Sequence, residues 1–471
     1  MYEGLCTDIS IEADRGKVAA GKLFFSWWRV ALYAGVFAAV FRGLQLLLRH
    51  TCDTWVAFDC PYYWPVSIFE IRSPGAMGFA TAGVTLGAFL VCYRVLERKQ
   101  FRMGLVVAFG CLLIVGSSLV QGVDTGLRAP VAGYAQDNVF IPNSPIGQEY
   151  YHDALTITDP FTVFVHYNEL QTTFHSHAHT HPPGALLTYY FLTKLLGDPA
   201  LISLAIMLFA MSLTVVCFYR LVATETSQST AKYMAFVIAI LPAVQVYYLA
   251  TIDAVITSLL IAALYLFCFS KRSWALPAAA LTVTASFLLT FVSLFILPVL
   301  GFYELIFRRS LKRFAVVTGT VVAVHLILYL ATGYNAWGAF REASHFENPN
   351  GPMPLVDTVN YLFTRLEDVA EILFFFGPFL LVMFWRGIKR MAFTPLFTLS
   401  VLGMATLLGM YIVGAFRTGE TARACAFIYP FLLFPIAKLL DSDSTKNARL
   451  QLASLVFLQT VLMQSLGTYH W

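Results

Sequence analysis

Residues 199–219, with the sequence PALISLAIMLFAMSLTVVCFY, contain no charged side chain. About 20 apolar residues suffice for an α-helix to cross the hydrocarbon core of a bilayer. Similar blocks recur along the 471-residue chain, in which 58% of the residues are hydrophobic and 12% are charged. That charged share is about half of what an average soluble domain carries. Because the apolar runs are continuous rather than alternating, the sequence predicts an all-α, polytopic membrane protein.

Clusters of Lys and Arg give the apolar blocks an orientation, because basic residues are retained on the cytoplasmic side of a membrane. The clearest clusters lie at Arg94–Arg102, Lys271–Arg272, Arg308–Arg313 and Arg386–Arg390. Placing all four inside gives one path of about thirteen spans, with the N-terminus inside and the C-terminus outside. The expected spans are 26–48, 75–95, 103–122, 199–219, 232–251, 254–270, 274–288, 290–306, 314–331, 369–385, 392–414, 424–440 and 450–466.

The same path places the long polar segments on the outer side, and residues 123–183 form the longest of them. Residues 184–196 are apolar but too short to span easily, so we expect a helix that lies in the membrane interface. Proline is tolerated in a first helical turn, and Pro182-Pro183 therefore marks the start of this helix. The expected fold is a transmembrane bundle with a large extracytoplasmic loop that carries juxtamembrane helices.

Two features bear on the compartment. Cys52 and Cys60 share the outer segment 49–74, where an oxidising environment would permit a disulfide, and two free thiols are the equal alternative. Mixed charges precede the first apolar block, which predicts an uncleaved anchor rather than a signal peptide. The sequence has no Asn-x-Ser/Thr acceptor for glycosylation. We therefore expect an integral protein of a bacterial inner membrane.

The outer segment contains an acidic and aromatic run, Glu149-Tyr-Tyr-His-Asp-Ala154. The carboxylates of Glu149 and Asp153 could deprotonate an acceptor alcohol, or they could hold a phosphate through a divalent cation. Tyr151 lies between them and is a candidate for substrate binding. The run therefore predicts chemistry just outside the bilayer.

Four histidines alternate about twenty residues later, at His175, His177, His179 and His181. In an extended strand they would share one face. His175 and His177 are candidate metal ligands, whereas His179 and His181 are candidates for donating hydrogen bonds to a phosphate. The alternative is structural, because histidines can also cap the following helix or pack against aromatic rings.

Two further places carry candidate residues. Arg417-Thr-Gly-Glu-Thr-Ala-Arg423 is an outer turn, and the planar fork of arginine suits phosphate. A loop ion pair between Glu420 and an arginine is the alternative. Asp253 is expected at the outer end of a helical pair, where a carboxylate is functional by default. It could equally act as the N-cap of the following helix.

The segment 332–368 holds many charged side chains, and we expect a solvated outer loop there. Its aromatic residues could form a platform for a sugar or a lipid, although an interfacial aromatic belt is the ordinary explanation. The charged and aromatic residues concerned are Arg341, Glu342, His345, Glu347, Asp357, Arg365, Glu367, Asp368, Tyr334, Trp337 and Phe340.

These runs together resemble the GT-C membrane glycosyltransferases that use polyprenyl-phosphate sugars. The similarity is to the branch that contains protein O-mannosyltransferases and the lipid A aminoarabinose transferase. It rests on four motifs: Glu149-Tyr-Tyr-His-Asp-Ala, His181-Pro-Pro-Gly, Asp253-Ala, and Gly419-Glu-Thr-Ala-Arg followed by Phe427-Ile-Tyr-Pro. The resemblance implies an N-terminal addition over 1–102, a catalytic core over 103–440 with its site in the outer loop 123–198, and a last helix over 441–471.

The resemblance also implies a reaction. A sugar would move from a polyprenyl-phosphate donor to a hydroxyl of a glycan, lipid or protein acceptor, through an oxocarbenium-like transition state. Asp153 or Glu149 would take the proton, and the choice between them stays open. Arg417, Arg423 and the histidines would stabilise the leaving phosphate, with Glu420 and Asp253 beside them. The implied partners are this donor, its acceptor and membrane lipids, not nucleic acid, and a divalent cation is an open cofactor.

Two other functions fit a polytopic chain. A flippase for lipid-linked sugars would place charges or broken helices inside the bundle, often in repeated halves. The sequence shows no repeat and places its polar residues in outer segments, which favours the transferase. A polysaccharide ligase would also use an outer loop, so the sequence does not separate it from the transferase.

Overall fold

The computed structural model describes residues 23–54, 71–98, 102–133, 149–390, 392–416, 420–467 and 469. Every regular element in these ranges is a helix, which confirms the predicted all-α class. Seven helices are long and apolar enough to cross a membrane, and the number becomes eight if one bent pair is counted as a span. The seven are α1 (Trp27–Thr54), α3 (Gly75–Arg98), α4 (Met103–Ser118) with the turn after it to Gln121, α10 (Pro199–Val222), α15 (Ile296–Arg308) with the turn before it from Phe291, α16 (Lys312–Thr332) and α21 (Pro395–Ile412). The expected count of thirteen stays a prediction.

Two expected spans are broken, and proline explains both breaks because its ring removes a backbone donor. The segment 232–251 forms α11 (Gln228–Ala239) and α12 (Pro242–Tyr247) instead of one helix. The segment 369–385 belongs to α19 (Thr358–Phe376) and α20 (Pro378–Ile388), which meet at 98°. Gly377 lies between them with φ +86°, a conformation that favours glycine. Continuous helices over these two segments were therefore a wrong prediction.

The interior of the bundle is built around α10. It packs against α4, α11 and α13 (Ile252–Cys268), and α13 continues the packing onto α14 (Ala275–Leu289), which contacts α16. On the other side, α23 (Tyr429–Asp443) packs against α20 and α21, and α24 (Lys446–Leu466) packs against α3 and α12. Helix contacts in lipid depend on close packing rather than on exclusion of water. The periphery is loose by comparison, since α1 and α16 bury few of their side chains.

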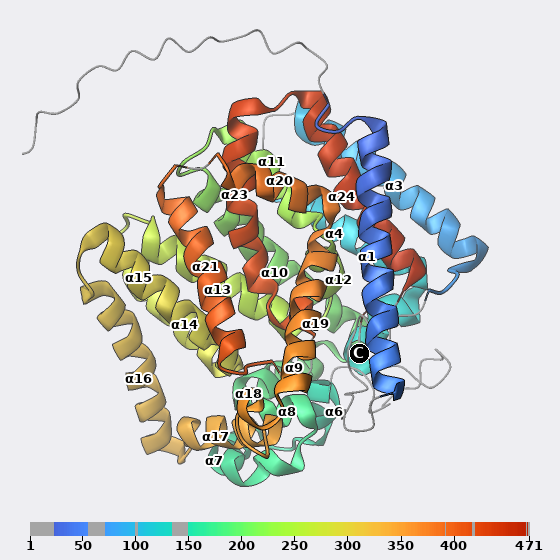
Figure 1. Cartoon of the computed structure of the whole chain (residues 1–471). Helices are drawn as coiled ribbons and strands as arrows, with labels where there is room; N and C mark the ends of the chain where they lie inside the picture. Colours follow the sequence, from blue (N-terminus) through green and yellow to red (C-terminus); the bar gives the residue numbers. More distant parts are fainter. Residues whose placement is uncertain are drawn as a thin grey trace, which may run out of the picture.

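Short helices gather at one end of the molecule, at the bottom of Figure 1. They come from two stretches of chain that the sequence assigned to outer segments, and their side of a membrane stays a prediction. They are α6 (Glu149–Thr156), α7 (Pro160–Leu170), α8 (Ser176–Thr180), α17 (Ala336–Glu347) and α18 (Met353–Val356). The short α5 (Ala129–Ala132) contacts α6 and α10. The next helix, α9 (Pro183–Leu196), begins at the second proline of the pair, as the sequence predicted. It packs against α6, α7, α10 and α14, and so connects this end to the bundle.

Gly184 sets the distance between α9 and α14. A Cβ atom at this position would overlap the backbone carbonyl of Leu288, which cannot move without shifting α14. We expect Gly184→Ala to destabilise the protein by about 1–3 kcal/mol, the usual effect of overpacking, and to lower the midpoint of thermal unfolding in detergent. Gly319→Ala is the matched control, because Gly319 lies in helix α16 with open space around its missing Cβ. Equal midpoints for the two variants would contradict the close approach of α9 and α14.

Candidate functional site

Arg423 is a buried cation that contacts residues from two distant parts of the chain and from its own turn. It lies in α22 (Thr421–Ala424) and is only 7% exposed. Its Nε atom is 3.5 Å from Oδ2 of Asp253 on α13, and its Nη2 atom donates to Oε2 of Glu420 and lies 3.1 Å from Nε2 of His177 on α8. A buried charge is costly unless it is paired. The two carboxylates therefore make this position of the guanidinium possible.

The backbone explains how these groups meet. Glu420 has a left-handed conformation with φ +59° and precedes α22, so its carboxylate folds back over Arg423 three residues later. The expected ion pair of Glu420 with an arginine is confirmed. Thr251, not Asp253, is the N-cap of α13, since its hydroxyl accepts from Ala254 N at 3.3 Å. The N-cap interpretation of Asp253 was therefore wrong, and its carboxylate is directed to Arg423 instead.

A second polar pair joins α6 to the start of α8. Oδ1 of Asp153 is 2.8 Å from Nδ1 of His175, and Oδ2 accepts from the His175 backbone N–H at 3.0 Å. The Asp153 side chain is 7% exposed, whereas the His175 side chain is 48% exposed. A carboxylate against Nδ1 keeps the proton on that nitrogen, so Nε2 becomes the acceptor atom of the ring. The pair can therefore take up a proton through His175.

Aromatic stacking connects the pair to the arginine. Tyr150 precedes Asp153 by three residues on α6, so both side chains lie on one face of the helix. Its ring stacks on His177 with 5.9 Å between centroids and meets His181 edge-on at 5.5 Å. On its other side Tyr150 stacks on Tyr189 of α9. His175 at the start of α8 and His177 within it therefore connect α6 to Arg423.

The four histidines do not share one face of an extended strand, because residues 176–180 are helical. His179 points elsewhere: its Nε2 is 3.4 Å from Oε1 of Glu342, and its ring packs on Phe346 of α17. His181 follows α8, and its Nδ1 lies 2.9 Å from the carbonyl oxygen of His177. Within the described part of the chain, no group of three or more His, Cys, Asp or Glu side chains is placed to hold a metal ion.

The other candidate residues lie apart from this centre or outside the described residues. Tyr151 is buried on α6 and meets His152 edge-on, away from Arg423. Glu149 begins α6, but its side chain is not among those described, and Arg417 and Cys60 lie outside the described residues. The same holds for the side chain of Cys52, so the disulfide stays a prediction.

The structure adds three carboxyl side chains that the sequence had placed wrongly or overlooked. Glu367, Asp368 and Glu371 lie on α19 and are completely buried, which contradicts the expected solvated loop up to residue 368. Asp368 pairs with Nη2 of Arg365 at 3.0 Å. Their spacing at i, i+1 and i+4 just before an apolar block could have indicated one buried face of a helix.

Glu371 connects this helix to the arginine. Its Oε2 accepts from the Ala422 backbone N–H and from the Thr421 hydroxyl, both at 3.2 Å. Those two residues directly precede Arg423 in α22. The carboxyl of Glu371 therefore fixes the backbone that presents the guanidinium, and it belongs to the candidate site as a positioning residue.

Comparison with known proteins gives no relative, since no protein-family model, no curated protein and no solved structure matches this chain. The functional argument therefore depends on the contacts around Arg423 and His175. Those contacts bring together cationic donors, a hydrogen-bonded imidazole and several carboxyl groups. Such a set can stabilise a developing negative charge and accept a proton close to it.

The burial of His181 makes the stability of the protein depend on pH in a way that can be tested. Burial, together with the nearby His177 and Arg423, lowers the pKa of its imidazole to about 3, although the His177 carbonyl opposes this. An unfolded histidine has a pKa of about 6.5, so between these values the unfolded state binds the proton and stability falls as the pH decreases. From pH 7.5 to 5.5 we expect a loss of about 1 kcal/mol from this residue.

The measurement is the thermal unfolding midpoint in detergent at the two pH values, for the parent chain and for His181→Asn. Asparagine keeps a donor near the His177 carbonyl but does not titrate. The variant should show the smaller decrease on acidification. An unchanged decrease would mean that His181 does not lose its proton on folding.

Proposed function

We propose that this protein is a membrane glycosyltransferase that moves a sugar from a polyprenyl-phosphate donor to an acceptor hydroxyl, at the end of the molecule that carries α6 and α8. The observation that supports it best is the convergence of Asp253, His177 and Glu420 on buried Arg423, beside the Asp153–His175 pair. The resemblance in the sequence motifs points the same way. We place this end on the extracytoplasmic face of a bacterial inner membrane.

The proton acceptor in this proposal is His175, and Asp153 positions it. The sequence left the base open between Asp153 and Glu149, but both oxygens of Asp153 are engaged by His175 and the carboxylate is buried. An acceptor hydroxyl can approach the half-exposed imidazole much more readily. Its Nε2 would take the hydroxyl proton as the oxygen attacks the anomeric carbon.

The donor phosphate leaves with negative charge. Arg423 is the permanent cation of the site formed with Asp253, Glu420 and His177. Its guanidinium is held in place by Asp253 and Glu420, so the positive charge is preorganised and need not reorient during the reaction. Nε2 of His177 lies 3.1 Å from Nη2 of Arg423, the nitrogen that also contacts Glu420, and His177 thus adds a second polar group. A direct displacement of this kind inverts the anomeric configuration. A divalent cation remains a prediction from the sequence. The two candidate metal ligands, His175 and His177, contact different partners.

A flippase for lipid-linked sugars is the second candidate, and one observation favours it. The acidic side chains of α19 lie inside the bundle, next to the 98° bend between α19 and α20. Buried carboxyls on a broken helix are a common feature of transport sites. A polysaccharide ligase would share the chemistry of the first proposal and differ in its acceptor.

Sugar transfer in proteoliposomes tests the proposal, with a panel of radiolabelled polyprenyl-phosphate sugars. General acid–base groups contribute about 10²- to 10⁴-fold to a rate, so we expect His175→Gln to reduce transfer at least a hundredfold, with Asp153→Asn reducing it less. Arg423→Lys should also reduce transfer, because lysine cannot make the same fork of contacts.

His166→Gln is the matched control. His166 forms an exposed pair with Glu169 on α7, with 3.0 Å between Nδ1 and Oε2, and takes no part in the proposed site. Transfer by this variant should equal that of the parent chain. Labelled donor that crosses the bilayer without any transfer would reject the transferase in favour of the flippase.

A further inference from the structure

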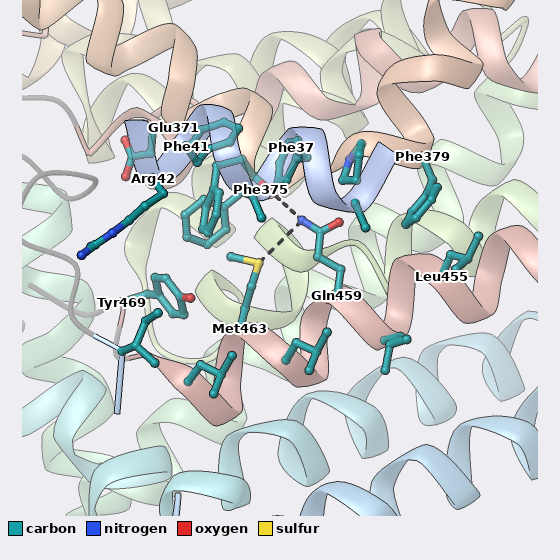
Figure 2. A pocket seen from close by; sticks show the side chains of 18 of the residues that line it. Phe37, Phe41, Arg42, Glu371, Phe375, Phe379, Leu455, Gln459, Met463 and Tyr469 are labelled. Carbon is teal, nitrogen blue, oxygen red and sulfur yellow. Dashed lines mark hydrogen bonds between the residues drawn. The ribbon is translucent and has the colours of Figure 1, made fainter. Parts of the chain in front are cut away.

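A cleft of about 400 Å³ lies between α1, α19, α20 and α24 (Figure 2). Its walls are aromatic and aliphatic. Phe374 of α19 stacks on Phe37 of α1 with 6.0 Å between centroids and lies 5.0 Å from Phe41. Leu458 and Leu462 of α24 form part of the opposite wall. The proposed reaction uses none of these side chains.

The cleft opens to the outside of the bundle along its length. Only 6% of the apolar part of α1 is buried inside the protein. Leu458 and Leu462 are 40% and 49% exposed, although both line the cleft. In a membrane these surfaces face hydrocarbon, and an empty apolar cleft would forfeit dispersion contacts on all of its walls. A lipid chain restores those contacts, whereas water would find few polar partners there.

The two charged side chains of the lining lie at one end, whereas the amide of Gln459 lies between the two ends. Arg42, Glu371 and Tyr469 lie at that end in Figure 2, while Phe379 and Leu455 lie at the other. Arg42 is exposed and donates to Oε1 of Gln45. The cleft therefore has the polarity of an amphiphile, with a cation at its mouth.

Glu371 supplies the second, independent indication of a ligand. Its side chain is completely buried and lines the cleft. Oε2 is occupied by the backbone of α22, but Oε1 has no hydrogen-bond partner among the described residues. A buried carboxyl oxygen without a donor is destabilising, because it has lost its hydrogen bonds to water without a replacement. A ligand that brings an N–H or O–H donor into the cleft would remove that cost.

We propose that the cleft binds one phospholipid whose headgroup carries both a phosphate and an ammonium group, as phosphatidylethanolamine does. One hydrocarbon chain lies between α1 and the wall formed by α19 and α24. The phosphate pairs with Arg42, and the ammonium group donates to Oε1 of Glu371. The lipid thereby attaches the loosely packed α1 to the bundle. This site does not depend on glycosyl transfer.

Native mass spectrometry of the delipidated full-length protein tests this, with phosphatidylethanolamine and phosphatidylcholine as probes. The parent chain should retain one equivalent and prefer phosphatidylethanolamine, because a trimethylated ammonium has no donor for Glu371. Glu371→Gln should abolish that preference. Arg42→Gln should weaken both lipids about tenfold, the effect of losing one bond to a charged group. Arg29→Gln on the same helix, outside the cleft, should bind like the parent.

Leu462→Trp provides a test that does not touch Glu371, whose loss could disturb α22. Leu462 faces outward, so the larger ring should fold normally and obstruct the cleft, and retention of both lipids should fall. Equal retention of the two lipids by the parent chain would overturn the proposal, as would unchanged binding in Leu462→Trp. Displacement of phosphatidylethanolamine by equimolar polyprenyl phosphate would also overturn it and would assign the cleft to that lipid.

Discussion

The arrangement of the candidate site depends on one constraint, the burial of the Arg423 guanidinium in a largely apolar bundle. A cation in such surroundings is stable only if opposite charges reach it. Asp253 and Glu420 provide these charges from α13 and from the residue before α22. The ends of two helices that are far apart in the sequence must therefore meet at one point. His177 reaches the same point from α8, which ties the short helices to the bundle.

Glu371 extends this constraint to the bent pair of helices. Its Oε2 holds the backbone of Thr421 and Ala422, while its own position depends on α19 ending at Gly377. The same side chain lines the cleft beside α1. One carboxyl group thus lies between the arginine centre and a surface where lipid can enter. In the proposal for the cleft, the lipid contacts Oε1 of Glu371, whereas Oε2 of the same carboxyl holds the backbone that precedes Arg423.

The sequence predicted the structural features that depend on local composition. It did not predict the features that depend on contacts between distant segments. Long continuous apolar blocks predicted the helical class, and Pro183 predicted the start of α9. The bend at Gly377 and the burial of Asp368 depend on packing between distant helices, which no local pattern records. Asp253 is a good N-cap residue by type, but Thr251 takes that place and the carboxylate of Asp253 lies beside Arg423. The alternating histidines would share one face of an extended strand, whereas residues 176–180 fold as a helical turn.

The division of work between Asp153 and His175 follows from burial. A carboxylate that is hydrogen-bonded through both oxygens and almost inaccessible is well suited to orient a neighbour and poorly suited to meet a substrate. The imidazole next to it has the opposite properties, since half of its surface is open and its Nε2 is an acceptor. Residue type alone makes Asp153 the natural base of a sugar transfer. In the proposed reaction the geometry favours His175 as the proton acceptor, with Asp153 of α6 as the residue that orients it.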